Sequence, residues 1–138
     1  MDLRSLNIFI QTAELNSFTK AATNDDIEFN FRVDPYQKVT YCGMRNRETS
    51  KPKNCWKVRL NHSGEGSGTI TRFWLASGTD VVSDSMNVKQ GSGNRYKFAF
   101  SSANRSVVRL RACNNNYSAN SYNVAGFWDE ETGVYKEN

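Results

Sequence analysis

Hydrophobic and polar residues follow two different periods along this chain, and the period changes near residue 23. Before that point, apolar residues recur at spacings of three and four, which places them on one face of a helix. After it, apolar residues alternate with polar ones, as in strands with one buried and one solvated face. The pattern therefore predicts a short helical segment over residues 1–22 and a separate β domain over residues 24–138.

The alternating segments of the β domain are short and regularly spaced, near residues 28–33, 56–61, 70–75, 86–89, 96–100, 108–112 and 122–124. Turns rich in Gly, Ser and Asn separate several of them, because these residues tolerate the backbone angles of tight turns. We expect the turns at 63–68 and 91–94 to close hairpins. This spacing of short alternating segments and turns favours a mainly β fold. We expect an antiparallel β-sandwich of about seven or eight strands, preceded by one short N-terminal α-helix.

Composition agrees with one folded domain that has a polar surface. The chain of 138 residues is 12% aromatic, whereas a disordered chain contains few aromatic residues. Its net charge of +4 permits an anionic partner without requiring one. There is no apolar run long enough for a transmembrane helix, and polar residues interrupt the N-terminal stretch too often for a signal peptide.

No catalytic, metal or cofactor motif stands out. The single histidine, His62, is expected in an exposed loop rather than in a hydrolytic triad. The glycine-rich turns lack the Lys-Ser/Thr pair and the helix of a phosphate loop. Asp129, Glu130 and Glu131 are adjacent in sequence, which favours a solvated acidic turn over a catalytic carboxylate pair. We therefore expect a protein that is not an enzyme and that uses no cofactor or metal.

The three cysteines allow at most one intramolecular disulfide. Cys42 and Cys55 would close a short loop, and such a closure stabilises by about 3 kcal/mol in the chain-entropy model. The alternative is three unrelated thiols in a reducing compartment.

Basic residues interleave with aromatic ones, which suggests a positive, aromatic sheet face. By alternation, Trp74 points to the other face of its strand from Phe73 and Leu75. It is therefore either exposed and able to stack on a ligand, or part of a thick core. Tyr117 and Tyr122 lie in an Asn/Ser-rich stretch of the kind that binding loops use. The candidate binding residues are therefore Arg72, Trp74, Arg109, Arg111, Tyr117 and Tyr122.

Two resemblances follow from specific residues. Met1-Asp2-Leu3-Arg4, Ala13-Glu14, Ser17-Phe18-Thr19 and Ala21-Ala22 resemble the opening of LysR-type transcriptional regulators. The recognition helix of that family has no counterpart here, so we interpret residues 1–22 as a fused or foreign N-terminus. Residues 24–138 resemble a family of small exported proteins of Gram-positive bacteria with undefined function, through Asn24-Asp25-Asp26, Trp56-Lys57-Val58, Asn114-Asn115-Asn116 and Gly126-Phe127-Trp128-Asp129.

The second resemblance implies secretion, although this chain shows no signal peptide. The leading hypothesis is a non-catalytic secreted domain that binds or modulates an extracellular protein, a glycan or an envelope component. A secreted antagonistic factor, such as a bacteriocin-like toxin or an inhibitor acting at a membrane surface, is the alternative. A DNA-binding regulator fragment rests only on residues 1–22, and nucleic acid is not the expected partner. The apolar helix face could also pair with a second copy to form a homodimer.

Overall fold

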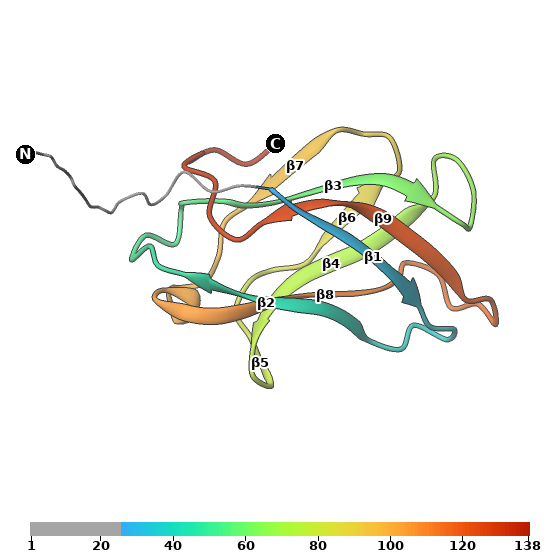
Figure 1. Cartoon of the computed structure of the whole chain (residues 1–138), viewed down its shortest axis with the longest axis horizontal. Coiled ribbons are helices and arrows are strands. Elements are labelled where there is room, and N and C mark those ends of the chain that lie inside the picture. The colour runs from blue at the N-terminus through green and yellow to red at the C-terminus, as the bar shows by residue number, and fades with distance from the viewer. Residues whose placement is uncertain (1–25) are drawn as a thin grey trace, which may run out of the picture.

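The computed structural model describes residues 26–138, and in them it confirms a mainly β, antiparallel architecture (Figure 1). Nine strands and one short 3-10 turn follow the order β1 Ile27–Val33, β2 Thr40–Arg47, β3 Trp56–Ser63, β4 Ile70–Ser77, β5 Asp80–Val81, β6 Met86–Lys89, β7 Asn94–Lys97, η1 Ser101–Ala103, β8 Ser106–Asn114 and β9 Tyr122–Asp129. The helix and the dimer contact expected for residues 1–22 lie outside the described residues. Within residues 26–138, no helix has the length and apolar character needed to cross a bilayer.

The strands form two sheets. Sheet A has the order β1-β9-β3-β7, and sheet B has the order β2-β8-β4-β5, with β6 also pairing with β4. All the strand pairs are antiparallel. Except for the β4-β5-β6 run, each strand lies in the other sheet from the strand before it. The chain therefore ties the two sheets together along most of its length.

This alternation corrects the expectation of hairpins at 63–68 and 91–94. The first turn leads from β3 in sheet A to β4 in sheet B, and the second leads from β6 in sheet B to β7 in sheet A. A glycine-rich turn allows the chain to reverse, but it does not decide which strand becomes the pairing partner. The first loop is held by Gln90, whose Oε1 accepts a hydrogen bond from the Gly68 N–H at 2.9 Å.

One hydrophobic core lies between the inner faces of the two sheets. Phe29 of sheet A and Phe73 of sheet B meet there with ring centroids 5.7 Å apart. Trp56 and Trp128 are the largest side chains of this core. The predicted alternation is confirmed for β1, β4, β8 and β9. In β3 the apolar row of Trp56, Val58 and Leu60 is buried as predicted, but Lys57, which was placed on the wet face, is buried as well.

Two segments depart from the predicted pattern. In the alternating segment predicted at residues 96–100, the pattern places Tyr96, Phe98 and Phe100 on the buried face, but Ala99 is the buried residue there and Phe100 is exposed. β7 ends at Lys97 and the turn η1 begins at residue 101, so regular alternation stops between them. The prediction also missed β2, whose sequence has no clear alternation and whose pairing with β8 shifts register between Tyr41 and Met44.

Candidate functional site

The outer face of sheet B gathers four of the six predicted binding residues. We call this surface the arginine face, and it comprises Arg72 and Trp74 on β4, Arg109 and Arg111 on β8, and Tyr41 on β2. Trp74 lies opposite Arg111, which in turn lies opposite Tyr41. Directly opposite residues of antiparallel strands point to the same side of the sheet, so these side chains form one row.

The guanidinium groups of this surface are held against the sheet but keep unused N–H donors. Arg109 Cζ lies 4.6 Å from the centroid of the Tyr41 ring, which is a cation–π contact. Arg111 Nη2 donates a hydrogen bond to the Gly78 carbonyl oxygen at 2.7 Å, and Arg72 Nε donates one to Asn87 Oδ1 at 3.5 Å. A guanidinium carries five N–H donors, so each group can still bind an acceptor on a ligand.

Apolar side chains flank the arginines on the same face. Met44, opposite Arg109, is 61% exposed. Val81 and Val107 are also exposed. Val81 of β5 pairs with Ala76 of β4, and Ala76 pairs on its other side with Arg109 of β8. Trp74 is half-buried on this outer side, which resolves its position: it is neither a core residue nor fully exposed. The surface therefore combines positive charge with apolar contact area.

The structure separates the two predicted tyrosines. Tyr122 is buried, and its hydroxyl lies 2.9 Å from Thr71 Oγ1. Burial raises the pKa of the Tyr122 hydroxyl, and this residue is not available to a ligand, so its assignment to a binding surface is wrong. The alternation of β9 turns Tyr122 inward together with Val124. Tyr117 is exposed in the β8–β9 loop and pairs with Tyr36, a residue that sequence reasoning did not select.

The acidic segment at the end of β9 is buried, which corrects the expected solvated turn. Asp129, Glu130 and Glu131 are all inaccessible, and basic residues on neighbouring strands compensate them. Arg45 Nε lies 3.0 Å from Glu130 Oε1, and the fully buried Arg47 donates to the Glu130 backbone carbonyl oxygen. These two arginines belong to β2, the strand that the sequence did not reveal.

Glu131 anchors the chain immediately after β2. Its carboxylate oxygens accept hydrogen bonds from the backbone N–H groups of Glu48 and Thr49, at 2.9 and 2.8 Å. Asp129 Oδ1 accepts a bond from the Glu131 N–H at 3.1 Å, which fixes the turn. On β3, the buried Lys57 places its ammonium 2.6 Å from Asp26. The acidic residues therefore act as structural ties between the sheets.

Burial dominates the ionisation of this segment. It raises the pKa of Asp129 from 3.8 to about 6, against the opposing effect of hydrogen bonding to the Glu131 backbone and of Arg45. It raises the pKa of Glu130 from 4.5 to about 7, although Arg45 favours the charged form. Both carboxyl groups therefore release their protons at higher pH in the folded protein than in an unfolded chain.

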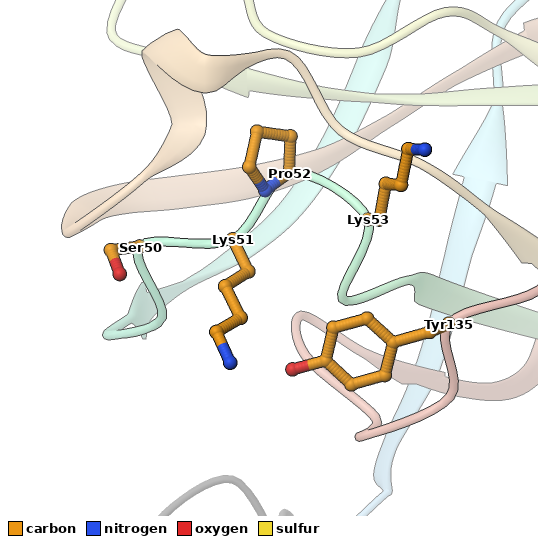
Figure 2. A pocket seen from close by; sticks show the side chains of 5 residues that line it. All are labelled: Ser50, Lys51, Pro52, Lys53 and Tyr135. Atoms are coloured by element: carbon orange, nitrogen blue, oxygen red, sulfur yellow. The ribbon is translucent and has the colours of Figure 1, made fainter.

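A shallow, open pocket of about 550 Å³ lies between the β2–β3 loop and the C-terminal segment, and it is lined by Ser50, Lys51, Pro52, Lys53 and Tyr135 (Figure 2). Lys51 Nζ lies 5.9 Å from the centroid of the Tyr135 ring. Lys53 instead approaches the ring of Phe98, also at 5.9 Å. The two lysines therefore do not converge on one point, and this pocket is a weaker binding candidate than the arginine face.

The histidine and the cysteines that the sequence offered as candidates do not come together in one site. His62 is exposed as expected, but it lies in β3 rather than in a loop. Cys55 is buried and free, which does not support a disulfide between Cys42 and Cys55, one of the two alternatives that the sequence left open. Burial raises the pKa of the Cys55 thiol to about 11, so at neutral pH it is not a thiolate. Within the part of the chain that the structure describes, no group of His, Cys, Asp and Glu residues could hold a metal ion.

Comparison with known proteins gives a family but no activity. The model of a protein family of unknown function, DUF2712, matches residues 17–132. The match begins within residues 1–22, the segment expected to be a fused or foreign N-terminus, and covers the whole of both sheets. No curated protein and no solved structure matches the chain.

Proposed function

We propose that this chain, which belongs to the DUF2712 family of unknown function, is a non-catalytic domain that binds an anionic partner outside the cell or at its surface. The observation that carries the proposal is the row of Trp74, Arg111 and Tyr41 across three neighbouring strands, with Arg72 and Arg109 beside it. The extracellular location rests on the resemblance of residues 24–138 to exported proteins.

The chemistry of the arginine face favours phosphate or carboxylate groups. Arginine presents a planar set of donors that matches these anions, and it remains charged at all physiological pH values. Its guanidinium groups lie on strands in the middle of a sheet rather than on loops. Since the backbone there is already ordered, little conformational entropy is lost on binding.

A polymer fits this surface better than a small anion. The positive groups are spread over the adjacent strands β4 and β8 rather than gathered around one point. Strands in a sheet are separated by about 4.8 Å, so the arginines can meet several charges along a flexible chain at once. Trp74 and Tyr41 add flat contact area between the charges. We therefore propose an anionic polymer of the cell envelope as the partner.

A second candidate, an antagonistic factor that acts on an anionic membrane, is favoured by the exposed apolar residues of the same face. Met44, Val81 and Val107 stand beside the arginines, and apolar side chains next to basic ones suit the boundary between lipid head groups and acyl chains. This candidate predicts binding to anionic vesicles that exceeds binding to a soluble polymer of the same charge.

The experiment compares two double variants that lose the same charge. Arg72→Gln/Arg111→Gln alters the arginine face, whereas Arg32→Gln/Arg105→Gln alters exposed arginines elsewhere. The probes are poly(glycerol phosphate), neutral dextran of similar length, and phosphatidylglycerol vesicles, each titrated at low salt by calorimetry.

We expect poly(glycerol phosphate) to bind, dextran not to bind, and the first double variant to weaken binding by about tenfold or more. The control double variant should weaken binding by about threefold at most, because it removes only long-range attraction. Equal losses in the two variants, or no binding of the polymer by the wild type, would overturn the proposal. Binding and leakage of vesicles alone would favour the membrane candidate.

A further inference from the structure

A second exposed surface lies where the β1–β2 and β8–β9 loops meet, at one end of the sheets (Figure 1). We call it the tyrosine tip, and it comprises Tyr36, Gln37, Asn115, Asn116, Tyr117 and Asn120. The rings of Tyr36 and Tyr117 lie 5.2 Å apart between centroids, with a tilt of 44°. Tyr117 is 74% exposed and Tyr36 is 48% exposed, so the pair is a two-ring aromatic platform in contact with solvent.

The backbone beneath this platform is held in an unfavourable conformation. Tyr36 has φ 59° and Gln37 has φ 56°, so two successive residues with side chains occupy the left-handed region. That region is unfavourable for residues other than Gly, Asn and Asp, and such strain concentrates at functional sites. The conformation places an aromatic ring where a glycine would be the ordinary choice.

Bonds between the two loops hold the strained turn. The Tyr36 N–H donates to the Ser118 carbonyl oxygen at 2.7 Å, and Gln37 Nε2 donates to the Asn115 carbonyl oxygen at 3.2 Å. Within the second loop, the Asn116 N–H bonds to Asn114 Oδ1 at 2.9 Å, and the Asn120 N–H bonds to Ser118 Oγ at 3.0 Å. The tip is therefore ordered before any ligand arrives, which lowers the entropy lost on binding.

The polar groups that make up the tip are neutral. Residues 115–121 read Asn-Asn-Tyr-Ser-Ala-Asn-Ser and contain no charged side chain. The β1–β2 loop adds one charge of each sign beside Tyr36 and Gln37: Asp34, which pairs with Arg32 at 3.0 Å, and the exposed Lys38. The exposed Asn116 and Asn120 carry amides, each of which donates and accepts hydrogen bonds. This chemistry differs from that of the arginine face and does not select an anion.

From these features we infer that the tyrosine tip is a binding site for a neutral oligosaccharide. The C–H faces of a sugar ring pack on aromatic rings, and its hydroxyl groups bond to side-chain amides. The tilt between Tyr36 and Tyr117 lets each ring contact a different sugar unit of a short chain. A stable protein partner is a poorer fit, because it needs about 800 Å² on each side and the tip consists of two short loops.

The test is a titration of the full chain, labelled with ¹⁵N, with neutral oligosaccharides followed by NMR. The probes are chitotetraose, cellotetraose, maltotetraose and mannotetraose. Four proteins are compared: the wild type, Tyr117→Ala, Tyr117→Phe and Arg111→Gln. Tyr117→Phe keeps the ring face, and Arg111→Gln changes only the arginine face.

We expect at least one probe to shift the amide signals of residues 36–37 and 115–121, with a dissociation constant of roughly 1 mM or below. Tyr117→Ala should weaken that binding by about tenfold, whereas Tyr117→Phe and Arg111→Gln should change it by about twofold at most. Thermal unfolding of Tyr117→Ala should stay close to that of the wild type, since the residue is exposed.

Absence of shifts at the tip with all four probes would overturn the inference. Shifts that persist unchanged in Tyr117→Ala would overturn it as well, because the platform would then play no part. Neither result bears on the arginine face, whose test uses different probes and different variants.

Discussion

The guanidinium of Arg47 donates a hydrogen bond to the backbone carbonyl oxygen of Glu130, 83 residues later in the chain. Arg47 ends β2, the edge strand of sheet B, and Glu130 directly follows β9 of sheet A. A second donor of Arg47 bonds to the Lys51 carbonyl oxygen at 2.9 Å. Since Arg47 is fully buried, these bonds are shielded from water. They make the C-terminal acidic segment part of the framework that supports β2 and the arginine face.

Glu131→Ala tests this framework. The substitution leaves the backbone N–H groups of Glu48 and Thr49 without their acceptor and removes a buried negative charge near Arg47. Loss of a buried charged partner typically costs about 3 kcal/mol, so the free energy of unfolding should fall by about that amount in urea titrations. Glu48→Ala, at an exposed side chain beside the same turn, should change it by about 0.5 kcal/mol at most. Equal effects of the two variants would refute a structural role for Glu131.

The raised pKa values of Asp129 and Glu130 predict how stability depends on pH. Between about pH 4 and pH 7 the folded protein keeps protons that the unfolded chain has released, since the ordinary values are 3.8 and 4.5 and the folded values are about 6 and about 7. Stability falls with rising pH wherever the native state binds more protons. The contribution of these two groups is therefore complete below pH 4 and is lost as pH rises to 7.

The measurement is the free energy of unfolding at several pH values for the wild type and for Asp129→Asn/Glu130→Gln. The double variant cannot titrate at these positions, so its stability relative to the wild type should improve steadily as pH rises from 4 to 7. A constant difference between the two proteins over this range would show that the two carboxyl groups have ordinary pKa values.

Gly126 is predicted to be irreplaceable in the pairing of β3 with β9. A Cβ atom at this position would lie 1.9 Å from the backbone oxygen of Arg59, and the backbone cannot yield without separating the strands. Gly126→Ala should therefore destabilise the protein by more than about 3 kcal/mol or prevent folding. Gly43→Ala, where a Cβ would meet nothing within 4 Å, should fold normally by circular dichroism. Normal folding of Gly126→Ala would show that β9 can shift at this position.

The sequence predicted the strands correctly wherever one face of the strand is buried and apolar and the other face is exposed to solvent. Val108, Leu110 and Ala112 of β8 are buried and alternate with Arg109 and Arg111, so that pattern identified both the strand and the arginines of its outer face. β2 lacks this pattern because the buried Arg47 and the half-buried Arg45 occupy inward positions at its end, and because a bulge interrupts its register. Alternation reports burial of apolar residues and misses strands that bury charge.

The same reasoning explains the errors at the candidate sites. Asp129, Glu130 and Glu131 looked solvated because their partners Arg45 and Arg47 are more than 80 positions away, and sequence spacing gives no sign of that proximity. Tyr36 was missed because its contact with Tyr117 depends on two loops meeting in space. Tyr122, by contrast, could have been placed inside, because it shares a face of its strand with Val124.

Tyr122→Phe tests the revised role of that residue. Removal of the hydroxyl leaves the buried Thr71 Oγ1 without its 2.9 Å partner, so the free energy of unfolding should fall by about 1 kcal/mol. Binding at either surface should remain unchanged, because Tyr122 is inaccessible. Thermal denaturation together with the two titrations described above would check this, and a loss of binding without a loss of stability would return Tyr122 to a binding surface.

The most direct test of the proposed function observes the arginine side chains themselves. The Nε–H signals of the arginines can be followed by NMR while poly(glycerol phosphate) is added to the full chain at low salt. We expect the signals of Arg72, Arg109 and Arg111 to shift together, while those of Arg32 and Arg105 stay in place, and we expect the shifts to reverse as salt is raised. Shifts spread evenly over all exposed arginines, or confined to those outside sheet B, would contradict a binding function of the arginine face.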